Sequence, residues 1–148
     1  QQVDEKTKKR ESLIIYLLIN YPDESYGALE NIAKNNLIKI ERNISIINKL
    51  YEEHEKGNIN IENIIDLFED ENTVNYLSGI MTTDFEIADI KKCIEDILVT
   101  YRKEYLLQKR NEVINKIDNA QKENLTKEEI ANLEEELNKI ILSLARIK

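Results

Sequence analysis

The chain has 148 residues, enough for one domain with a hydrophobic core and an additional element. Its formal net charge of −8 argues against a protein that grips the phosphate backbone of a nucleic acid, and no segment resembles a signal peptide or a membrane span. With 3 Gly and 1 Pro it holds too few turn-forming residues for a sandwich of many short strands, so the composition favours an all-α fold.

The first part of the sequence predicts a compact bundle of short helices over residues 1–100. A helix at residues 7–20 contains the continuous apolar run 13–19, which indicates a buried, central position. Pro22 ends it, because the residue before a proline is disfavoured in the helical region. Ile59 and Ile64 have the spacing of a hydrophobic staple, and Gly57 is a typical helix stop. Further helices are therefore expected at residues 24–34, 38–56, 60–69 and 72–81.

The next segment predicts one long helix. Thr83 and Glu86 have the spacing of a capping box, and neither Gly nor Pro follows before residue 123. A helix over residues 84–122 would be about 58 Å long at 1.5 Å per residue. A globule of 100 residues is only about 35 Å across, given its expected radius of gyration. The second half of this helix is therefore expected to project from the bundle.

The C-terminal segment, residues 101–148, predicts an antiparallel helical hairpin. Thr126 and Glu129 form a second capping box, and a loop at residues 123–125 is short enough to reverse the chain. The last helix has apolar residues at heptad spacing, namely Ile130, Leu133, Leu137, Ile140, Leu144 and Ile147. The matching seam on the long helix consists of Leu106, Val113, Ile117 and Ala120, with Arg110 at one seam position.

The hairpin has more apolar residues than one seam requires. Leu107 and Ile114 lie beside the first seam, and Ile141 lies beside the second. An exposed strip of this kind usually marks a binding site for a partner protein. The alternative is that the hairpin folds back and buries these residues on the bundle.

The sequence holds no recognisable catalytic or metal-binding pattern. His54 is the only histidine and Cys93 the only cysteine, which excludes an internal disulfide and a zinc site of several such ligands. The carboxylates near Asp66 lack the spacing of a calcium-binding loop, and no glycine-rich phosphate loop or nucleophile elbow is present. We therefore expect a non-catalytic chain without metal or cofactor, in the reducing cytoplasm.

The order of these features resembles the C-terminal helicase-binding domain of the bacterial DnaG-type replicative DNA primase. The resemblance rests on the run RESLIIYLL at residues 10–18, followed by Asn20, Tyr21 and Pro22. It continues with the apolar positions of residues 44–50, with Gly57 and with the segments 64–67 and 76–78. The long helix and hairpin complete it. No single motif is diagnostic, and the order of weak motifs carries the resemblance across nearly the whole chain.

The resemblance implies a module that docks onto the N-terminal domain of the replicative helicase and so couples primer synthesis to the replication fork. The bundle would modulate the helicase, and no direct contact with nucleic acid or membrane is implied. The zinc-binding and polymerase domains of such a primase would lie upstream, which suits a chain whose only methionine is Met81. The implied contacts with the partner are Leu107, Arg110 and Ile114 on the long helix and Ile141, Leu144, Arg146 and Ile147 on the last.

Two other interpretations remain open. The chain could be the N-terminal domain of the replicative helicase itself, an oligomerisation and docking module of similar fold. It could also be a small enzyme that uses its acidic middle segment, since residues 52–96 contain 13 acidic and 3 basic residues. The run of residues 17–22 and the polar, helical C-terminus favour the primase interpretation.

Overall fold

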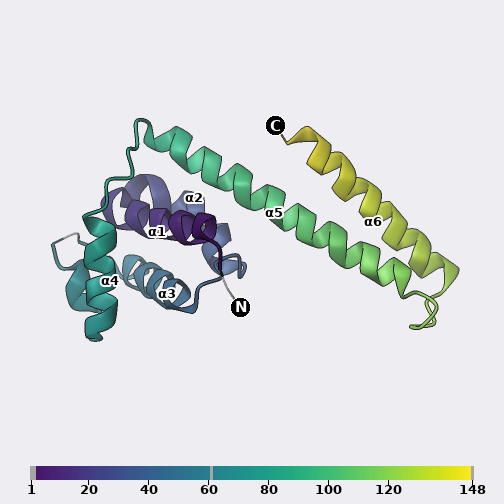
Figure 1. The fold of residues 1–148 in the computed structure, drawn as a ribbon, viewed down its shortest axis with the longest axis horizontal. Coiled ribbons are helices and arrows are strands. Elements are labelled where there is room, and N and C mark those ends of the chain that lie inside the picture. The colour runs from purple at the N-terminus through teal and green to yellow at the C-terminus, as the bar shows by residue number, and fades with distance from the viewer. Residues whose placement is uncertain (1–2, 61, 148) are drawn as a thin grey trace. The chain divides into compact units, whose positions relative to one another are not determined.

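The computed structural model describes residues 3–60 and 62–147, and every regular element in this part of the chain is helical (Figure 1). The all-α prediction is confirmed. The chain divides into two compact units, an N-terminal unit that ends at Ile97 and a C-terminal unit that begins at Leu98. The helices are α1 (Glu5–Asn20), α2 (Pro22–Lys34), α3 (Glu41–Glu55), the short 3₁₀ helix η1 (Ile64–Leu67), α4 (Glu71–Met81), α5 (Ile90–Asp118) and α6 (Lys127–Arg146).

Helix α1 is the centre of the N-terminal unit. Asp4 caps it by accepting a hydrogen bond from the backbone N–H of Thr7 at 2.8 Å, and this bond holds the pKa of the Asp4 carboxyl below its usual value. The helix packs against α2, α3 and α4. Most of its apolar run is buried as predicted, with Ile14, Ile15, Leu17, Leu18 and Ile19 all nearly inaccessible to solvent, whereas the other two residues of the run, at positions 13 and 16, are half-buried. Complete burial of one such side chain stabilises the fold by about 1.5–3 kcal/mol.

A fully buried carboxylate on α1 organises the entry to α3. Glu11 Oε2 accepts a hydrogen bond from the backbone N–H of Lys39 at 2.8 Å, and Oε1 accepts one from Ile40 at 3.2 Å. Oε1 also accepts a bond from Asn43 Nδ2 at 2.9 Å. A carboxylate in the core is tolerated only when its oxygens are satisfied in this way.

The same network reaches α4. The hydroxyl of Tyr76 donates a hydrogen bond to Asn43 Oδ1 at 2.7 Å, so the buried amide links Glu11 on α1 to the aromatic ring on α4. The guanidinium of Arg42 lies over the Tyr76 ring, 3.5 Å from its centroid. Three helices are therefore joined by one continuous set of polar contacts.

Two of the predicted bundle helices differ from the structure. Helix α3 begins at Glu41 rather than at residue 38, because Glu11 holds the backbone of Lys39 and Ile40 before the helix. The predicted helix at residues 60–69, of which residue 61 lies outside the described residues, is reduced to η1. There the side chain of Asn60 accepts a bond from the backbone N–H of Glu62 at 3.0 Å, and such local bonds compete with helix formation.

The prediction of one helix over residues 84–122 is wrong at both ends. Thr83 forms no capping box, because its hydroxyl donates to the carbonyl of Gly79 at 2.7 Å and so closes the end of α4. Glu86 has a φ of 53°, which interrupts any helix there. Helix α5 begins after Asp89, whose carboxylate accepts from the backbone N–H of Lys92 at 3.2 Å. Its 29 residues span about 44 Å.

The connection to the last helix is longer than the predicted loop at residues 123–125. It occupies residues 119–126 and contains Asn124 in the left-handed region, at a φ of 54°. The predicted start of α6 is confirmed. The backbone N–H of Glu129 donates to Thr126 Oγ1 at 3.1 Å, and the Glu129 carboxylate accepts from the Thr126 backbone N–H at 3.2 Å. The projection of the hairpin from the bundle stays a prediction.

Replacing the buried carboxylate should destabilise the N-terminal unit. Glu11→Gln replaces one carboxylate oxygen with an amide NH₂ group. That group cannot accept the hydrogen bonds that the oxygen accepts in the native chain, so we expect a loss of about 2–4 kcal/mol in the free energy of unfolding. Urea unfolding followed by circular dichroism measures this loss. Glu30→Gln, which removes an exposed ion pair with Lys34, is the matched control and should change little. An equal effect of both substitutions would contradict the role assigned to Glu11.

Removing the cap of α6 should loosen the C-terminal unit alone. Thr126→Ala deletes the acceptor for the Glu129 N–H and should lower the stability of α6 by about 1 kcal/mol. Thr126→Ser keeps a hydroxyl acceptor and should retain most of that stability. Amide hydrogen exchange should rise in α6 and leave α1 unchanged. A matching rise in α1 would show that the two units unfold together.

Candidate partner-binding surface

The predicted seam of the C-terminal unit is buried at three of its positions. Within it α5 and α6 run in opposite directions (Figure 1). Val113 and Ala120, on α5 and just after it, are buried, as is Ile140 on α6. All three occupy predicted seam positions. Counting outward from the loop in steps of three and four residues pairs the seam as Ile117 with Leu133, Val113 with Leu137, Arg110 with Ile140 and Leu106 with Leu144.

Arg110 interrupts this seam with a cation. Its side chain is half-buried, and its Nε is buried without a hydrogen-bond partner. The seam register places Arg110 level with Ile140, the most buried residue of α6. A buried donor without a partner costs free energy, so packing alone does not account for an arginine at this position.

The structure divides the predicted contact residues into two groups. Ile114, Ile141 and Arg146 are exposed, with 37% of Ile114 and 47% of Ile141 accessible to solvent. The others are half-buried, namely Leu107, Arg110, Leu144 and Ile147. Leu144 and Ile147 belong to the seam, so only part of each side chain is left for a partner.

Helix geometry brings the residues outside the seam together. Leu107 and Ile114 each follow a seam residue by one position on α5, and Ile141 follows a seam residue by one position on α6. In an antiparallel pair these positions share one flank. Leu142 follows Ile141 and lies about 100° further round α6, so it extends this exposed apolar surface away from the seam, with 58% of its side chain exposed. We call these four residues (Leu107, Ile114, Ile141 and Leu142) the apolar patch.

The opposite flank has a different composition. It carries Arg102, Lys109 and Lys116 on α5 and Glu129 and Glu136 on α6, so this flank is lined by charged side chains, of which Lys116 and Glu136 lie nearly level in the seam register. The two flanks use the same backbone geometry, so their difference lies only in the side chains. The flank that carries the apolar patch is the one suited to a protein partner.

Sequence reasoning missed three exposed apolar residues of this unit, Val99, Tyr105 and Leu142. Leu142 could have been predicted from the sequence. The three consecutive apolar residues at positions 140–142 are one more than a seam position and its neighbouring flank position require. Val99 and Tyr105 gave no such signal. Within residues 3–60 and 62–147, all five exposed large hydrophobic side chains belong to the C-terminal unit, and the N-terminal unit has none.

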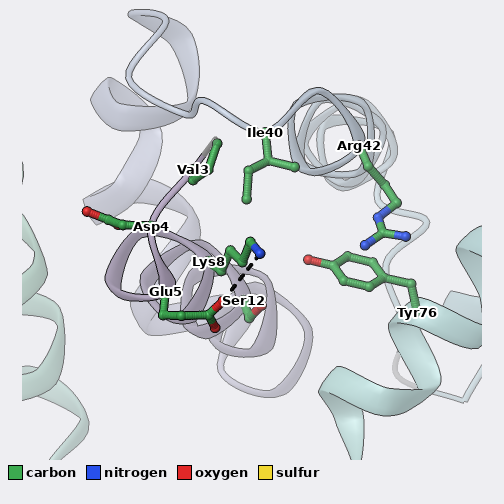
Figure 2. Close-up of a pocket in the computed structure, with 8 residues that line it drawn as sticks. All are labelled: Val3, Asp4, Glu5, Lys8, Ser12, Ile40, Arg42 and Tyr76. Carbon is green, nitrogen blue, oxygen red and sulfur yellow. Dashed lines mark hydrogen bonds and ion pairs between the residues drawn. The ribbon is translucent and has the colours of Figure 1, made fainter. Parts of the chain in front are cut away.

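The N-terminal unit has an open hollow of about 670 Å³ beside α1 (Figure 2). Figure 2 shows Lys8 paired with Glu5 and the guanidinium of Arg42 against the ring of Tyr76. The Tyr76 hydroxyl is already bonded to Asn43. Most of the polar groups on its walls thus already have partners within the protein.

The single histidine and cysteine show no catalytic arrangement. His54 is exposed and its ring stacks on Tyr26, with centroids 3.9 Å apart. Cys93 is half-buried, and burial, followed by the nearby Asp96 carboxylate, raises the pKa of its thiol.

Among the residues described, no group of three or more His, Cys, Asp or Glu side chains could hold a metal ion. None of the described helices is long and apolar enough to cross a membrane.

Comparison of the chain with protein-family models, with curated proteins and with solved structures finds no match.

Proposed function

We propose that the chain is a protein-docking module that binds its partner through the apolar patch of the C-terminal unit. The observation that carries this proposal is the confinement of every exposed large hydrophobic side chain of the described residues to that unit. The N-terminal unit buries its large apolar side chains, so those that stay exposed in the C-terminal unit are best explained as a binding surface.

The energetics of the apolar patch suit a moderate, reversible complex. Complete burial of one Leu or Ile side chain contributes about 1.5–3 kcal/mol, and the four patch residues start from partial exposure. Association costs several kcal/mol in lost translational and rotational freedom. A few such anchors can support a micromolar complex, provided that they form the centre of the interface.

As the partner we propose the N-terminal domain of the replicative helicase. The support is the resemblance to the helicase-binding domain of bacterial primase, whose opening run corresponds to the buried core of α1. The Glu11 of that run organises the entry to α3. In this proposal the chain performs no catalysis, acts in the cytoplasm at the replication fork, and recruits a primase through its C-terminal helices.

The chain should bind the purified N-terminal domain of the helicase from the same organism. Titration calorimetry with both proteins folded measures the dissociation constant. No heat of binding at roughly 50 µM would limit the binding free energy to less than about 6 kcal/mol and would refute the helicase as partner.

Ile114→Asp should weaken this binding by about tenfold or more, because it places a charge in the apolar patch. Tyr105→Asp is the matched control, since Tyr105 is similarly exposed on α5 and lies on the opposite flank. It should leave the affinity within about twofold. Circular dichroism of both variants should match the native chain. If Ile114→Asp lowers the melting temperature as much as it lowers affinity, Ile114 belongs to a core and the folded-back interpretation is correct.

Arg110→Met should separate stability from binding. Methionine fills the seam position without a buried donor, so the free energy of unfolding of the C-terminal unit should stay equal or rise by about 1 kcal/mol. Affinity for the partner should fall, because the guanidinium beside the apolar patch is lost. A variant that gains stability and keeps full affinity would assign Arg110 no part in binding.

A further inference from the structure

Basic residues and exposed apolar residues are concentrated at the same end of the C-terminal unit. We call residues 99–114 and 137–147 the open end, and residues 115–136 the loop end. The open end carries six basic and two acidic residues, a balance of +4, whereas the loop end carries three basic and seven acidic residues, a balance of −4. All five exposed large hydrophobic side chains lie in the open end.

Basic side chains lie one turn from members of the apolar patch on both helices, and one of them, Lys139, makes an exposed ion pair with Glu135 at 3.6 Å. On α6, Lys139 precedes Leu142 by three residues and Arg146 follows it by four, so both lie one turn away on the same face, and both are exposed. On α5, Arg110 lies between Leu107 and Ile114, and the exposed Lys103 lies one turn before Leu107. Residues 137–147 contain no acidic side chain.

We propose that the open end recognises an acidic protein surface, an apolar groove whose edges carry carboxylates, and that Lys103, Arg110, Lys139 and Arg146 pair with those carboxylates. This inference rests on the proposed docking function and adds the chemistry of the partner. The apolar patch supplies affinity by desolvation, and the surrounding cations supply orientation and rate. The acidic loop end is repelled by the same partner surface, so the two ends together specify one direction of docking.

Other occupants fit the observations less well. A nucleic acid would be held by phosphate contacts and base stacking, yet the centre of the site is aliphatic, Glu104 and Glu112 are exposed beside it, and the chain carries a net charge of −8. A membrane surface takes the continuous apolar face of a helix, and on α6 that face is the seam with Ile140 at its centre. A second copy would bring equal positive ends together if the two patches met.

The proposal predicts a specific dependence on salt. Exposed charges that lie within a Debye length attract an oppositely charged surface strongly at about 50 mM salt and weakly at about 500 mM. Because these charges steer the encounter, the association rate should carry most of the change and the dissociation rate little. An interface made of apolar contacts alone would show neither effect.

The test uses the full chain and the N-terminal domain of the helicase, with association and dissociation rates measured by surface plasmon resonance at both salt concentrations. The variant Lys103→Glu with Arg146→Glu reverses two cations of the open end. The matched control, Lys116→Glu with Lys122→Glu, reverses two exposed cations of the loop end. Lys116 and Arg146 each lie in the last turn of their helix. The unfavourable interaction of a new glutamate with the helix dipole is therefore the same in both variants.

The open-end variant should lose about tenfold in affinity at low salt, and the loss should shrink at high salt, whereas the loop-end variant should bind within about twofold of the native chain. Salt-independent binding, or equal losses in both variants, would overturn this inference and leave the docking function intact. If the native chain binds neither at low salt nor at high salt, both the docking function and this inference are overturned. Salt-sensitive binding of the native chain to anionic vesicles or single-stranded DNA, lost in the open-end variant, would assign the site a different occupant.

Discussion

The N-terminal unit depends on one buried carboxylate. Glu11 accepts hydrogen bonds from the entry to α3 and from Asn43, and Asn43 in turn holds Tyr76 on α4. Such a group is costly to bury and is stable only in one arrangement of its donors. It therefore sets where α3 begins and how α1, α3 and α4 meet, while the apolar run of α1 supplies the driving force. Loss of the bond from the Lys39 backbone N–H would leave one of the two Glu11 carboxylate oxygens without a hydrogen bond in the core.

The C-terminal unit follows a different principle, because two helices cannot enclose a core of their own. A seam of heptad spacing buries Val113 and Ile140, and everything beside that seam stays accessible. One flank carries charged residues and the other carries apolar residues. Arg110 adds a second departure from packing, since its Nε has no hydrogen-bond partner in the seam. Both departures lie in the open end, where a partner protein would supply what the unit lacks.

Apolar exposure and positive charge occur together along this unit, and neither would be as informative alone. A scattered exposed leucine is ordinary on a protein surface, and so is a basic residue near a helix C-terminus. Their shared restriction to the open end, against an acidic loop end, gives the surface a polarity. Desolvation of the apolar patch and attraction by its cations would act at the same place, which favours a partner with an acidic, grooved face.

The sequence by itself determined the helical class, the burial of most of the apolar run of α1 and the cap of α6 at Thr126, because these features depend on neighbours within a few turns. Only the tertiary structure decided the start of α3 at Glu41, which is set by a carboxylate that lies 28 residues before Lys39 in the chain. It also decided the helical break at residues 83–89, where Thr83 bonds backward to Gly79 instead of capping forward. A capping pattern states which bonds are possible, whereas the folded chain decides which competing partner is nearer.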